Sequence, residues 1–465
     1  MTPRDRTVAP PVFDATILAR YDRSGPRYTS YPTAPHFNDT FGPADYLAAV
    51  GKAGQAPGRE ASFYFHLPFC RRVCYFCACN TIFTNDRNTG RAYTDDLKRE
   101  MDLVLDAMRH RPAVRQLHWG GGTPTFSPPE ILDELGRAIH ERLTFAPGAE
   151  VSVEVDPRET TPAHLDVLAG HGFNRISLGV QDFDADVQKA VNRVQPWEMT
   201  KGVVDAARAR GFGSVNIDLI YGLPRQTPAV FEATLDRLLE LDPDRVALFN
   251  FAYLPEMVRH QRVIKPEQLP PPADKLAMFR RGIERLTGAG LVFIGMDHFA
   301  RADDELALAL EAGTLGRNFQ GYTTHAGLDL FGFGVSAIGQ VGDTYAQNQK
   351  SREAWRAALD AGVAPVARGI TLMRDDEIRR AVIMELMSRF ALDREKLARR
   401  FGIDVDDYFA DEFRRLSALE EDGLVTVTPA AITVTAAGRL LVRNVAMIFD
   451  AWLAGEAAPR YSRTV

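Results

Sequence analysis

Short strand-like runs alternate with longer helix-like segments over residues 60–300, and this alternation limits the possible folds more than any other feature. Helix-like segments such as 92–110 and 228–241 separate the apolar runs. One strand and one helix together take about 30 residues, which is typical of parallel βα units. The strands are expected at residues 63–67, 114–119, 150–155, 175–180, 214–220, 245–251 and 291–297.

Six or seven such units favour a full or partial (β/α) barrel over an open doubly wound sheet. Polar residues follow the strand ends, where barrels place their active sites. We therefore expect an α/β fold with a catalytic barrel domain over residues 56–365. The alternation alone leaves open whether the barrel is closed.

The two ends of the chain differ from this pattern. Residues 1–55, with many prolines and aromatic residues at 25–37, are predicted to form an N-terminal arm. Residues 366–465 are predicted to form a C-terminal domain of amphipathic helices, a strand hairpin and a last helix, which is a winged-helix-like order. Acidic and basic residues are mixed there, so a packing or lid domain is favoured over a DNA reader.

Composition excludes several classes of protein. The chain has 465 residues, 45% of them hydrophobic, and a formal net charge of −6. It lacks the basic run of a nucleic-acid reader. No apolar run reaches the ~18 residues of a membrane span, and residues 1–14 lack the apolar stretch of a signal peptide. We therefore expect a soluble cytoplasmic protein.

All four cysteines lie between positions 70 and 79. A disulfide framework would spread its cysteines to close loops, so this spacing indicates a metal or redox site. Cys70, Cys74 and Cys77 form C-x3-C-x2-C after an apolar strand. Three thiolates can hold three corners of a [4Fe–4S] cluster and leave one iron open for S-adenosylmethionine (SAM).

Two alternatives compete with the open cluster. A structural zinc site usually needs a second Cys or His pair, and the chain has none at a suitable spacing. Cys79 could complete a closed site of four thiolates, which would be an electron carrier. The adjacent aromatic residues Tyr75 and Phe76 and the barrel behind them favour the open site, with Cys79 in a secondary role.

The cysteine loop, with an aromatic residue before its last cysteine, resembles the radical SAM superfamily. Longer motifs resemble the oxygen-independent coproporphyrinogen III oxidase family over nearly the whole chain. The glycine strand HWGGGTPT (118–125) is shared across the superfamily, but YTSYPTA (28–34), GMDHFA (295–300) and RNFQGYTT (317–324) are far more specific. The similar heme-chaperone branch lacks these three motifs. The resemblance implies a partial barrel of the radical SAM type.

The glycine run 120–122 and the carboxylate of Glu154 each have two interpretations, a ligand contact and a structural role. Gly120–Gly122 follow a strand and can approach a ligand closely, although a plain turn is the alternative. Glu154 alternates with Val153 and Val155, so it faces the other side of its strand, where a carboxylate suits the hydroxyls of a ribose. An ion pair with Arg175 or Arg158 is the alternative.

Two bound SAM molecules are implied by the resemblance. By motif position, Tyr64, Gly121 and Glu154 match residues that hold the first. Residues that match those holding the second are Phe76, Gly122, Thr123, Gln181, Arg193, Asp218, Ala252 and Ile338. Gln181, Arg193 and Asp218 also follow three successive strands, so they could converge on a barrel mouth. His66, His118 and His298 each stand alone beside a strand and are expected to hydrogen-bond, not to bind metal.

The implied activity is that of an oxidoreductase of heme and porphyrin biosynthesis. It converts two propionates of coproporphyrinogen III to vinyl groups without O₂, giving protoporphyrinogen IX. An unactivated C–H bond requires a radical from SAM, so no protein side chain is expected to be catalytic. Arg27 and Arg317 are the candidate contacts for the anionic substrate. A monomer that takes electrons from a donor such as flavodoxin or ferredoxin is expected. The alternatives are a heme-binding chaperone without decarboxylase activity and a porphyrin-ring-opening SAM enzyme.

Overall fold

A computed structural model describes residues 10–454 and 461–464. Residues 1–9 of the predicted arm lie outside the described residues, and so do residues 455–460 and 465 near the C-terminus. Most of the segment 1–14, which lacks the apolar stretch of a signal peptide, is therefore not described. The chain divides into two compact units. The barrel unit comprises residues 37–281 and 328–371, and the terminal unit comprises the described residues of 1–36, 282–327 and 372–465. The predicted boundaries at 55 and 365 stay a prediction.

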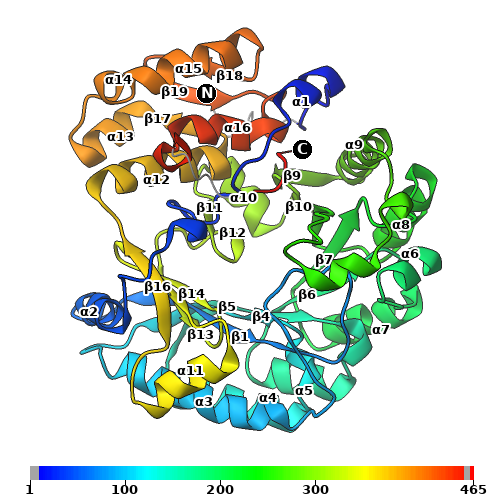
Figure 1. Cartoon of the computed structure of the whole chain (residues 1–465), viewed down its shortest axis with the longest axis vertical. Helices are drawn as coiled ribbons and strands as arrows, with labels where there is room; N and C mark the ends of the chain where they lie inside the picture. Colours follow the sequence, from blue (N-terminus) through cyan, green and yellow to red (C-terminus); the bar gives the residue numbers. More distant parts are fainter. Residues whose placement is uncertain (1–9, 455–460, 465) are drawn as a thin grey trace. The chain divides into compact units, whose positions relative to one another are not determined.

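The barrel unit is built on one curved sheet (Figure 1). Its strands follow the order β16-β15-β14-β13-β1-β4-β5-β6-β7-β8. Strands β13, β1 and β4 to β8 pair in parallel, and β14 to β16 add on antiparallel. The order is linear and does not close on itself, so the barrel is partial. The bounds are β1 Glu60–Leu67, β4 Ala113–Gly121, β5 Phe145–Val155, β6 Arg175–Gln181, β7 Ser214–Tyr221, β8 Arg245–Asn250, β13 Asp329–Phe333, β14 Ile338–Val341, β15 Thr344–Asn348 and β16 Val366–Thr371.

Amphipathic helices cover the outer face of this sheet, as Figure 1 shows for α3, α4 and α5. Helix α4, for example, buries Ile131, Leu135 and Ile139 at helical spacing and leaves its charged side chains partly or fully exposed. The helices of this unit are α2 Pro43–Ala53, α3 Thr89–Leu105, α4 Pro129–Arg142, α5 Pro162–Gly170, α6 Ala185–Ala190, α7 Trp197–Ala209, α8 Pro228–Glu240 and α11 Arg352–Asp360. Helix α9 (Pro272–Gly288) runs from this unit into the terminal unit.

Strand β5 shows how an alternating sequence pattern directs a polar side chain away from the core. Val151, Val153 and Val155 are at most 5% exposed and pack into the core. Ser152 and Glu154 alternate with them and are only partly buried. The predicted orientation of Glu154, opposite to the valines, is therefore confirmed.

The terminal unit contains antiparallel β-hairpins and a helical C-terminal region. Strands β9 (Leu291–Gly295) and β10 (His298–Arg301) pair antiparallel, as do β11 (Gly316–Asn318) and β12 (Gly321–Thr323). A small sheet of β17 (Ala391–Asp393), β19 and β18 follows α12, in the predicted winged-helix-like order. The other elements are α1 Ala15–Tyr21, α10 Glu305–Glu311, α12 Arg374–Arg389, α13 Arg394–Phe401, α14 Val405–Tyr408, α15 Ala410–Glu421, β18 Val425–Val427, β19 Ala431–Val434 and α16 Val442–Ala446.

One strand differs from its predicted role. The run at 291–297 was expected to be a seventh parallel βα strand, but its β9 portion turns back into β10 as an antiparallel hairpin. Gly295 makes this turn possible, because its φ of 151° is a conformation that glycine tolerates best.

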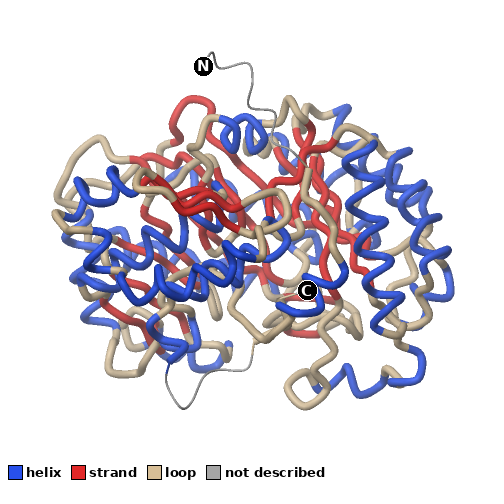
Figure 2. The backbone as a smooth tube through the Cα atoms, turned by 90° about the horizontal axis from the view of Figure 1, so that it is seen from above, coloured by secondary structure: helices blue, strands red, loops and turns tan. Residues whose placement is uncertain are grey.

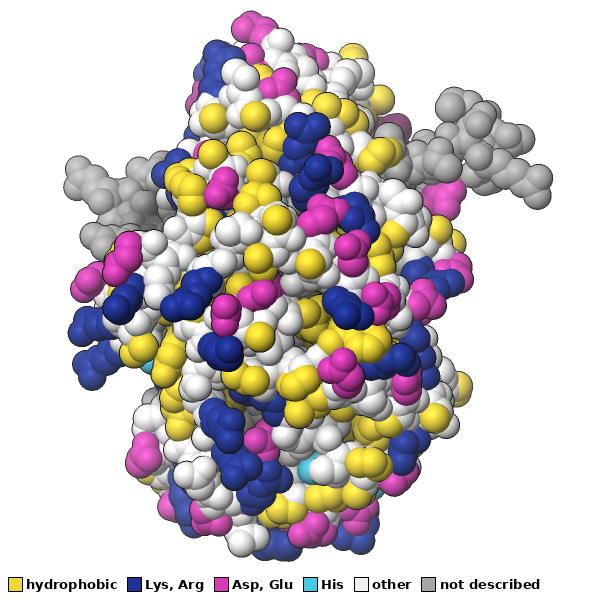
Figure 3. Space-filling model, turned by 90° about the vertical axis from the view of Figure 1, so that its right-hand side faces the viewer, with side chains coloured by type: hydrophobic (Ala, Val, Ile, Leu, Met, Phe, Trp, Pro, Cys, Tyr) yellow, Lys and Arg dark blue, Asp and Glu magenta, His cyan; other side chains and the backbone are white. Residues whose placement is uncertain are grey.

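Strands and helices are interspersed along the described chain, and Figure 2 shows the helices in blue and the strands in red. On the face drawn in Figure 3, basic and acidic side chains are mixed, in keeping with a net charge of −6. Among the described helices, none has the length and apolar character needed to cross a bilayer.

Candidate functional site

A cavity of 540 Å³ lies at the carboxyl ends of the parallel strands of the barrel unit. Barrels bring the ends of different strands together at this edge, so residues far apart in sequence share one pocket. All four cysteines line it. The other predicted site residues that line it are Phe76, Gly121, Gly122, Thr123, Glu154, Gln181, Arg193 and Asp218.

The cysteine loop is held at both ends. It leaves the short strand β2 (Phe69–Cys70) and returns through β3 (Ile82–Phe83), and these two pair in parallel. In the middle, the backbone N–H of Tyr75 donates to the carbonyl of Val191 at 3.0 Å. The loop therefore has a defined path over the cavity, and all four thiols are free of disulfides.

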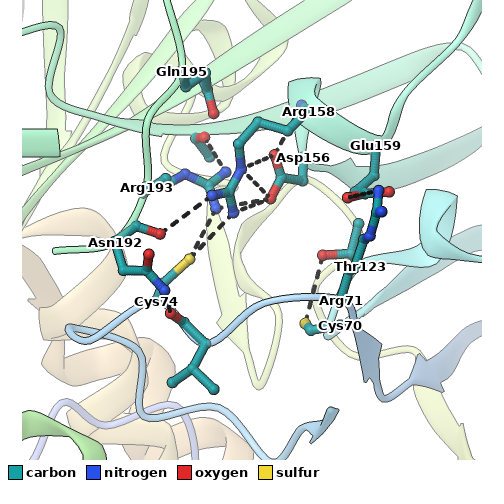
Figure 4. A network of polar contacts seen from close by, with 12 residues as sticks. Cys70, Arg71, Cys74, Thr123, Asp156, Arg158, Glu159, Asn192, Arg193 and Gln195 are labelled. Atoms are coloured by element: carbon teal, nitrogen blue, oxygen red, sulfur yellow. Dashed lines mark hydrogen bonds and ion pairs between the residues drawn. The ribbon is translucent and has the colours of Figure 1, made fainter. Parts of the chain in front are cut away.

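Two guanidinium groups approach the sulfur of Cys74 (Figure 4). The Nη2 of Arg158 lies 3.3 Å from Cys74 Sγ, and the Nη1 of Arg193 lies 3.5 Å from it. Both arginines also donate to Asp156, at 2.7 and 3.0 Å. Burial alone would raise the pKa of Asp156, but Arg193 and Arg158 outweigh burial and lower it. Asp156 is therefore ionised and joins the two cations.

The other thiols have different surroundings. Cys70 Sγ lies 3.6 Å from the hydroxyl of Thr123, and burial raises the pKa of this thiol to about 12. Cys77 Sγ accepts the backbone N–H of Cys79 at 3.4 Å. A hydrogen bond between the two side chains lowers the pKa of Cys77 and raises that of Cys79. Of this pair, Cys77 is thus the thiol that ionises first.

Two glycines are required where strand β4 ends against the loop. Gly121 has a φ of 114°, and a Cβ there would lie 2.7 Å from the ring of His66. A Cβ on Gly122 would lie 2.6 Å from the backbone of Pro68. A larger residue at either position would clash with His66 or Pro68, so the glycines allow close packing here. The predicted close approach of these glycines to a ligand stays a prediction.

Glu154 enters the cavity with both oxygens engaged. One accepts the backbone N–H of Gly121 at 3.1 Å, and the other lies 3.4 Å from His118 Nε2. Burial alone would raise the pKa of Glu154, but these two partners lower it. The predicted alternative partners have carboxylates of their own: Arg158 pairs with Asp156 and Arg175 with Glu150.

Two further polar residues reach the cavity from the next strands. Gln181 ends β6 with a φ of 73°, a strained conformation for a residue other than glycine and one that is common at functional sites. Asp218 on β7 accepts from Asn216 at 2.8 Å. Burial, with Glu154 nearby, raises the pKa of Asp218 to about 7.

Three predicted site residues are not in the lining of this cavity. The Tyr64 hydroxyl is 2.9 Å from His66 Nδ1, and the Tyr64 ring stacks on His118, which contacts Glu154. The carbonyl of Ala252 and that of Phe76 both accept from Gln261. Ile338 begins β14, and its carbonyl lies against Gly332, which is opposite Tyr64 in the sheet.

The three expected hydrogen-bonding histidines have polar partners. His66 contacts Tyr64 and the carbonyl of Asn80, and His118 contacts Ser152 and Glu154. His298 lies 2.8 Å from Asp297. Within residues 10–454 and 461–464, no three His, Cys, Asp or Glu side chains are grouped tightly enough to hold a single metal ion.

The donor set fits a [4Fe–4S] cluster. Each iron of such a cluster takes one thiolate, so the thiols need to surround a pocket and not converge on one point. All four thiols do so beside a glycine wall, and Cys79 is the exposed one of the four. Arg193 Nε is also buried without a hydrogen-bond partner among the described residues, which suits a bound ligand in the cavity.

The two candidate substrate contacts belong to the terminal unit. Arg27 forms an ion pair with Asp297 there. Arg317 on β11 is 9% exposed and lies 4.7 Å over the ring of Tyr322. Its Nε and Nη1 are buried and lack hydrogen-bond partners within the described part of the chain. Burial lowers the pKa of Arg317.

Asp156 and Arg158 were not predicted as site residues. Both lie in the segment VEVDPRE, but only Glu154 was singled out from it, and Arg158 was weighed only as an ion-pair partner of Glu154. The contact of Arg158 with Cys74 joins residues 84 positions apart and depends on the folded barrel, and Asp156 takes part through its bonds to Arg158.

A cavity of this kind, with a three-cysteine loop over the ends of parallel strands, defines a radical SAM protein. The profile described as the Radical SAM superfamily matches residues 64–238, and that described as the HemN C-terminal domain matches residues 372–441. A [4Fe–4S] cluster and SAM are the cofactors of this superfamily.

Relatives match over the full length of the chain. Oxygen-independent coproporphyrinogen III oxidase of Pseudomonas aeruginosa is 47% identical over 97% of this chain and 99% of its own. The Escherichia coli protein of the same name is 47% identical, with 97% and 98% covered. The solved structure of coproporphyrinogen III oxidase (HemN) from Escherichia coli, described as a radical SAM enzyme, has a TM-score of 0.91 at 46% identity, covering 96% of this chain and 100% of that one. The chain therefore belongs to the oxygen-independent coproporphyrinogen III oxidase family.

Proposed function

We propose that this chain decarboxylates two propionates of coproporphyrinogen III to vinyl groups without O₂, giving protoporphyrinogen IX. One observation carries the proposal: a chain related over its whole length to enzymes of this name places a three-cysteine loop and a glycine wall around one cavity. When bound, the cluster and SAM supply a 5′-deoxyadenosyl radical, which abstracts a hydrogen atom that no protein base could remove as a proton.

We propose that Cys70, Cys74 and Cys77 ligate the cluster. Their position in one cavity supports this role, and the two loop strands that pair on either side keep them there. Cys79 is exposed and remains outside the proposed ligand set.

We further propose that the cavity and the residues beside it hold two SAM molecules. Tyr64, Gly121 and Glu154 would hold the first; the bonds that lower the pKa of Glu154 keep it an acceptor for ribose hydroxyls. The proposed contacts of the second are Phe76, Gly122, Thr123, Gln181, Arg193, Asp218, Ala252 and Ile338. For Gln181, Arg193 and Asp218, the shared lining supports the assignment.

Within the terminal unit, we propose that Arg317 and Arg27 bind substrate carboxylates. Nε and Nη1 of Arg317, which lack partners among the described residues, are available to donate charge-assisted hydrogen bonds to substrate carboxylates. Arg27 is paired with Asp297, so a propionate there would share it with that carboxylate. We also propose that the protein acts as a cytoplasmic monomer and takes electrons from a donor such as flavodoxin or ferredoxin.

An anaerobic assay tests the function directly. Protein with a reconstituted cluster is incubated with coproporphyrinogen III, SAM and dithionite, and the products are separated after oxidation to porphyrins. We expect a divinyl product and 5′-deoxyadenosine. An intact cluster with no vinyl product, together with heme retained on the purified protein, would instead indicate a heme chaperone.

A further inference from the structure

We propose that Arg158, held by Asp156, is a positioning residue that sets the reduction potential of the cluster through its hydrogen bond to the sulfur of Cys74. This inference rests on the proposed ligation of the cluster by Cys74. Arg158 lines the cavity, and neither the sequence pattern nor the family resemblance predicted a contact between this side chain and the cluster.

The guanidinium of Arg158 is fixed on three sides. Its Nε and Nη2 donate to the two oxygens of Asp156, at 3.0 and 2.7 Å. Its Nη1 is 3.4 Å from the carbonyl of Asn192. The side chain is only 12% exposed. These bonds leave Nη2 directed at Cys74 Sγ, 3.3 Å away, as Figure 4 shows.

A cysteine that ligates an iron–sulfur cluster is a thiolate, and with this ligation the charges of the group around Cys74 balance. Arg158 and Arg193 bring two positive charges, and Asp156 brings one negative charge. A thiolate at Cys74 supplies the second negative charge. The group is therefore arranged for an anionic sulfur, and Asp156 keeps the two like-charged guanidiniums together next to it.

Of the three proposed ligands, Cys74 is the one that has charged donors at hydrogen-bond distance within the described part of the chain. Cys70 contacts the neutral hydroxyl of Thr123, and Cys77 contacts a backbone N–H. Cys74 is also the buried one of the three, so the charge of its partners is little screened by water. The corner of the cluster at Cys74 is thus the one where the protein acts most strongly on the potential.

The direction of the effect follows from charge. Reduction adds one electron to the cluster, breaks no bond and moves no proton. The added charge is shared with the ligand sulfurs, so a cationic donor on sulfur stabilises the reduced state more than the oxidised state. Arg158 therefore raises the potential and makes the cluster easier to reduce.

The test measures the midpoint potential of the cluster in full-length, anaerobically reconstituted protein without substrate. Arg158→Gln removes the charge and the fork, and Arg158→Lys keeps the charge but cannot bond Asp156 and Cys74 with the same fixed geometry. Arg87→Gln is the matched control, because Arg87 pairs with Glu159, the residue next to Arg158, and has no thiol as a hydrogen-bond partner among the described residues. Iron content and the EPR spectrum of the reduced cluster are recorded for each protein.

We expect a more negative midpoint for Arg158→Gln, a smaller negative shift for Arg158→Lys, and the wild-type value for Arg87→Gln. A wild-type midpoint in Arg158→Gln with full iron content overturns the inference and leaves the proposed function intact. If Arg158→Gln holds no cluster, Arg158→Lys decides: a negative shift supports the inference, and an unchanged midpoint overturns it. Wild-type protein that cannot hold a cluster at all would refute the proposed function itself.

Discussion

Cys79 differs from the three proposed cluster ligands in its exposure to solvent. We expect Cys70→Ala, Cys74→Ala or Cys77→Ala each to abolish the cluster and all SAM cleavage, because each removes one of three iron ligands. Cys79→Ser should retain near-normal iron, since its backbone N–H to Cys77 is unchanged. Iron content and 5′-deoxyadenosine formation check this. If Cys79→Ser lost iron as completely as the other three variants, a closed site of four thiolates that carries electrons would be the better interpretation.

Glu154 provides a second prediction at the residue scale. Glu154→Ala should weaken SAM binding and leave the cluster in place, because a ribose contact is not an iron ligand. Loss of charge-assisted bonds of this kind costs about 1.5–3 kcal/mol, or about 10- to 150-fold in Kd. A SAM titration of the reconstituted variant measures the change. Unchanged affinity would assign Glu154 to holding His118 and the Gly121 turn.

Asp218 makes stability depend on pH. Its pKa is raised from 3.8 to about 7 in the folded protein, so the unfolded chain loses this proton first as pH rises. The stabilising contribution of the protonated carboxyl is full below pH 4 and is lost as pH rises to about 7. The Tm of Asp218→Asn relative to that of the wild type should therefore be about 1–3 °C higher at pH 8 than at pH 5. An equal difference in Tm at both pH values would contradict the raised pKa.

The site residues differ in how far the sequence could predict them. Glu154 follows from period-two alternation along one strand, which is a local property. Gln181 and Asp218 follow from the rule that polar residues at the strand ends of a barrel share one edge. The pairing of Arg158 with Cys74 has no local signal, because it depends on how a loop and a distant turn meet.

At the scale of elements, the parallel strands were predictable and one hairpin was not. The parallel strands β1 and β4 to β8 of the main sheet are apolar runs, because sheets covered by helices bury their strands. The run that forms β9 has the same apolar character, but its partner is the adjacent β10. Periodicity describes the burial of a strand and not the direction of its neighbour.

The β11–β12 hairpin carries a prediction of its own. Its Arg317 is fixed over Tyr322 with two N–H groups unused among the described residues. Arg317→Ala should lower coproporphyrinogen turnover by about tenfold or more, the loss of one charge-assisted contact, and leave substrate-free SAM cleavage largely intact. Arg301→Ala is the control, since Arg301 is an exposed arginine of β10 that pairs with Asp303. Wild-type vinyl formation in Arg317→Ala would exclude this residue from substrate binding.

At the scale of the whole molecule, both ends of the described chain belong to the terminal unit. The backbone of Gly25 donates to the carbonyl of Ser462 at 3.0 Å, and that of Thr464 donates to Arg23 at 2.8 Å. Arg443, which is 5% exposed, donates to the carbonyls of Pro26 and Arg463. Residues 10–36 of the predicted arm are therefore an integral part of this unit, whereas residues 37–55 and every residue that lines the cavity belong to the barrel unit.

Deleting residues 1–35 should consequently separate the two activities. The deletion leaves the buried Arg443 without its acceptors at positions 25 and 26, which weakens the terminal unit that carries Arg317. Coproporphyrinogen turnover should fall to near background, while iron content and substrate-free SAM cleavage remain close to wild type. Deleting residues 1–9 is the control, because it removes none of these hydrogen bonds. If the long deletion forms vinyl groups at the wild-type rate, the arm has no part in handling the substrate. If it loses the cluster as well, the arm supports the barrel unit and its proposed role in substrate binding is wrong.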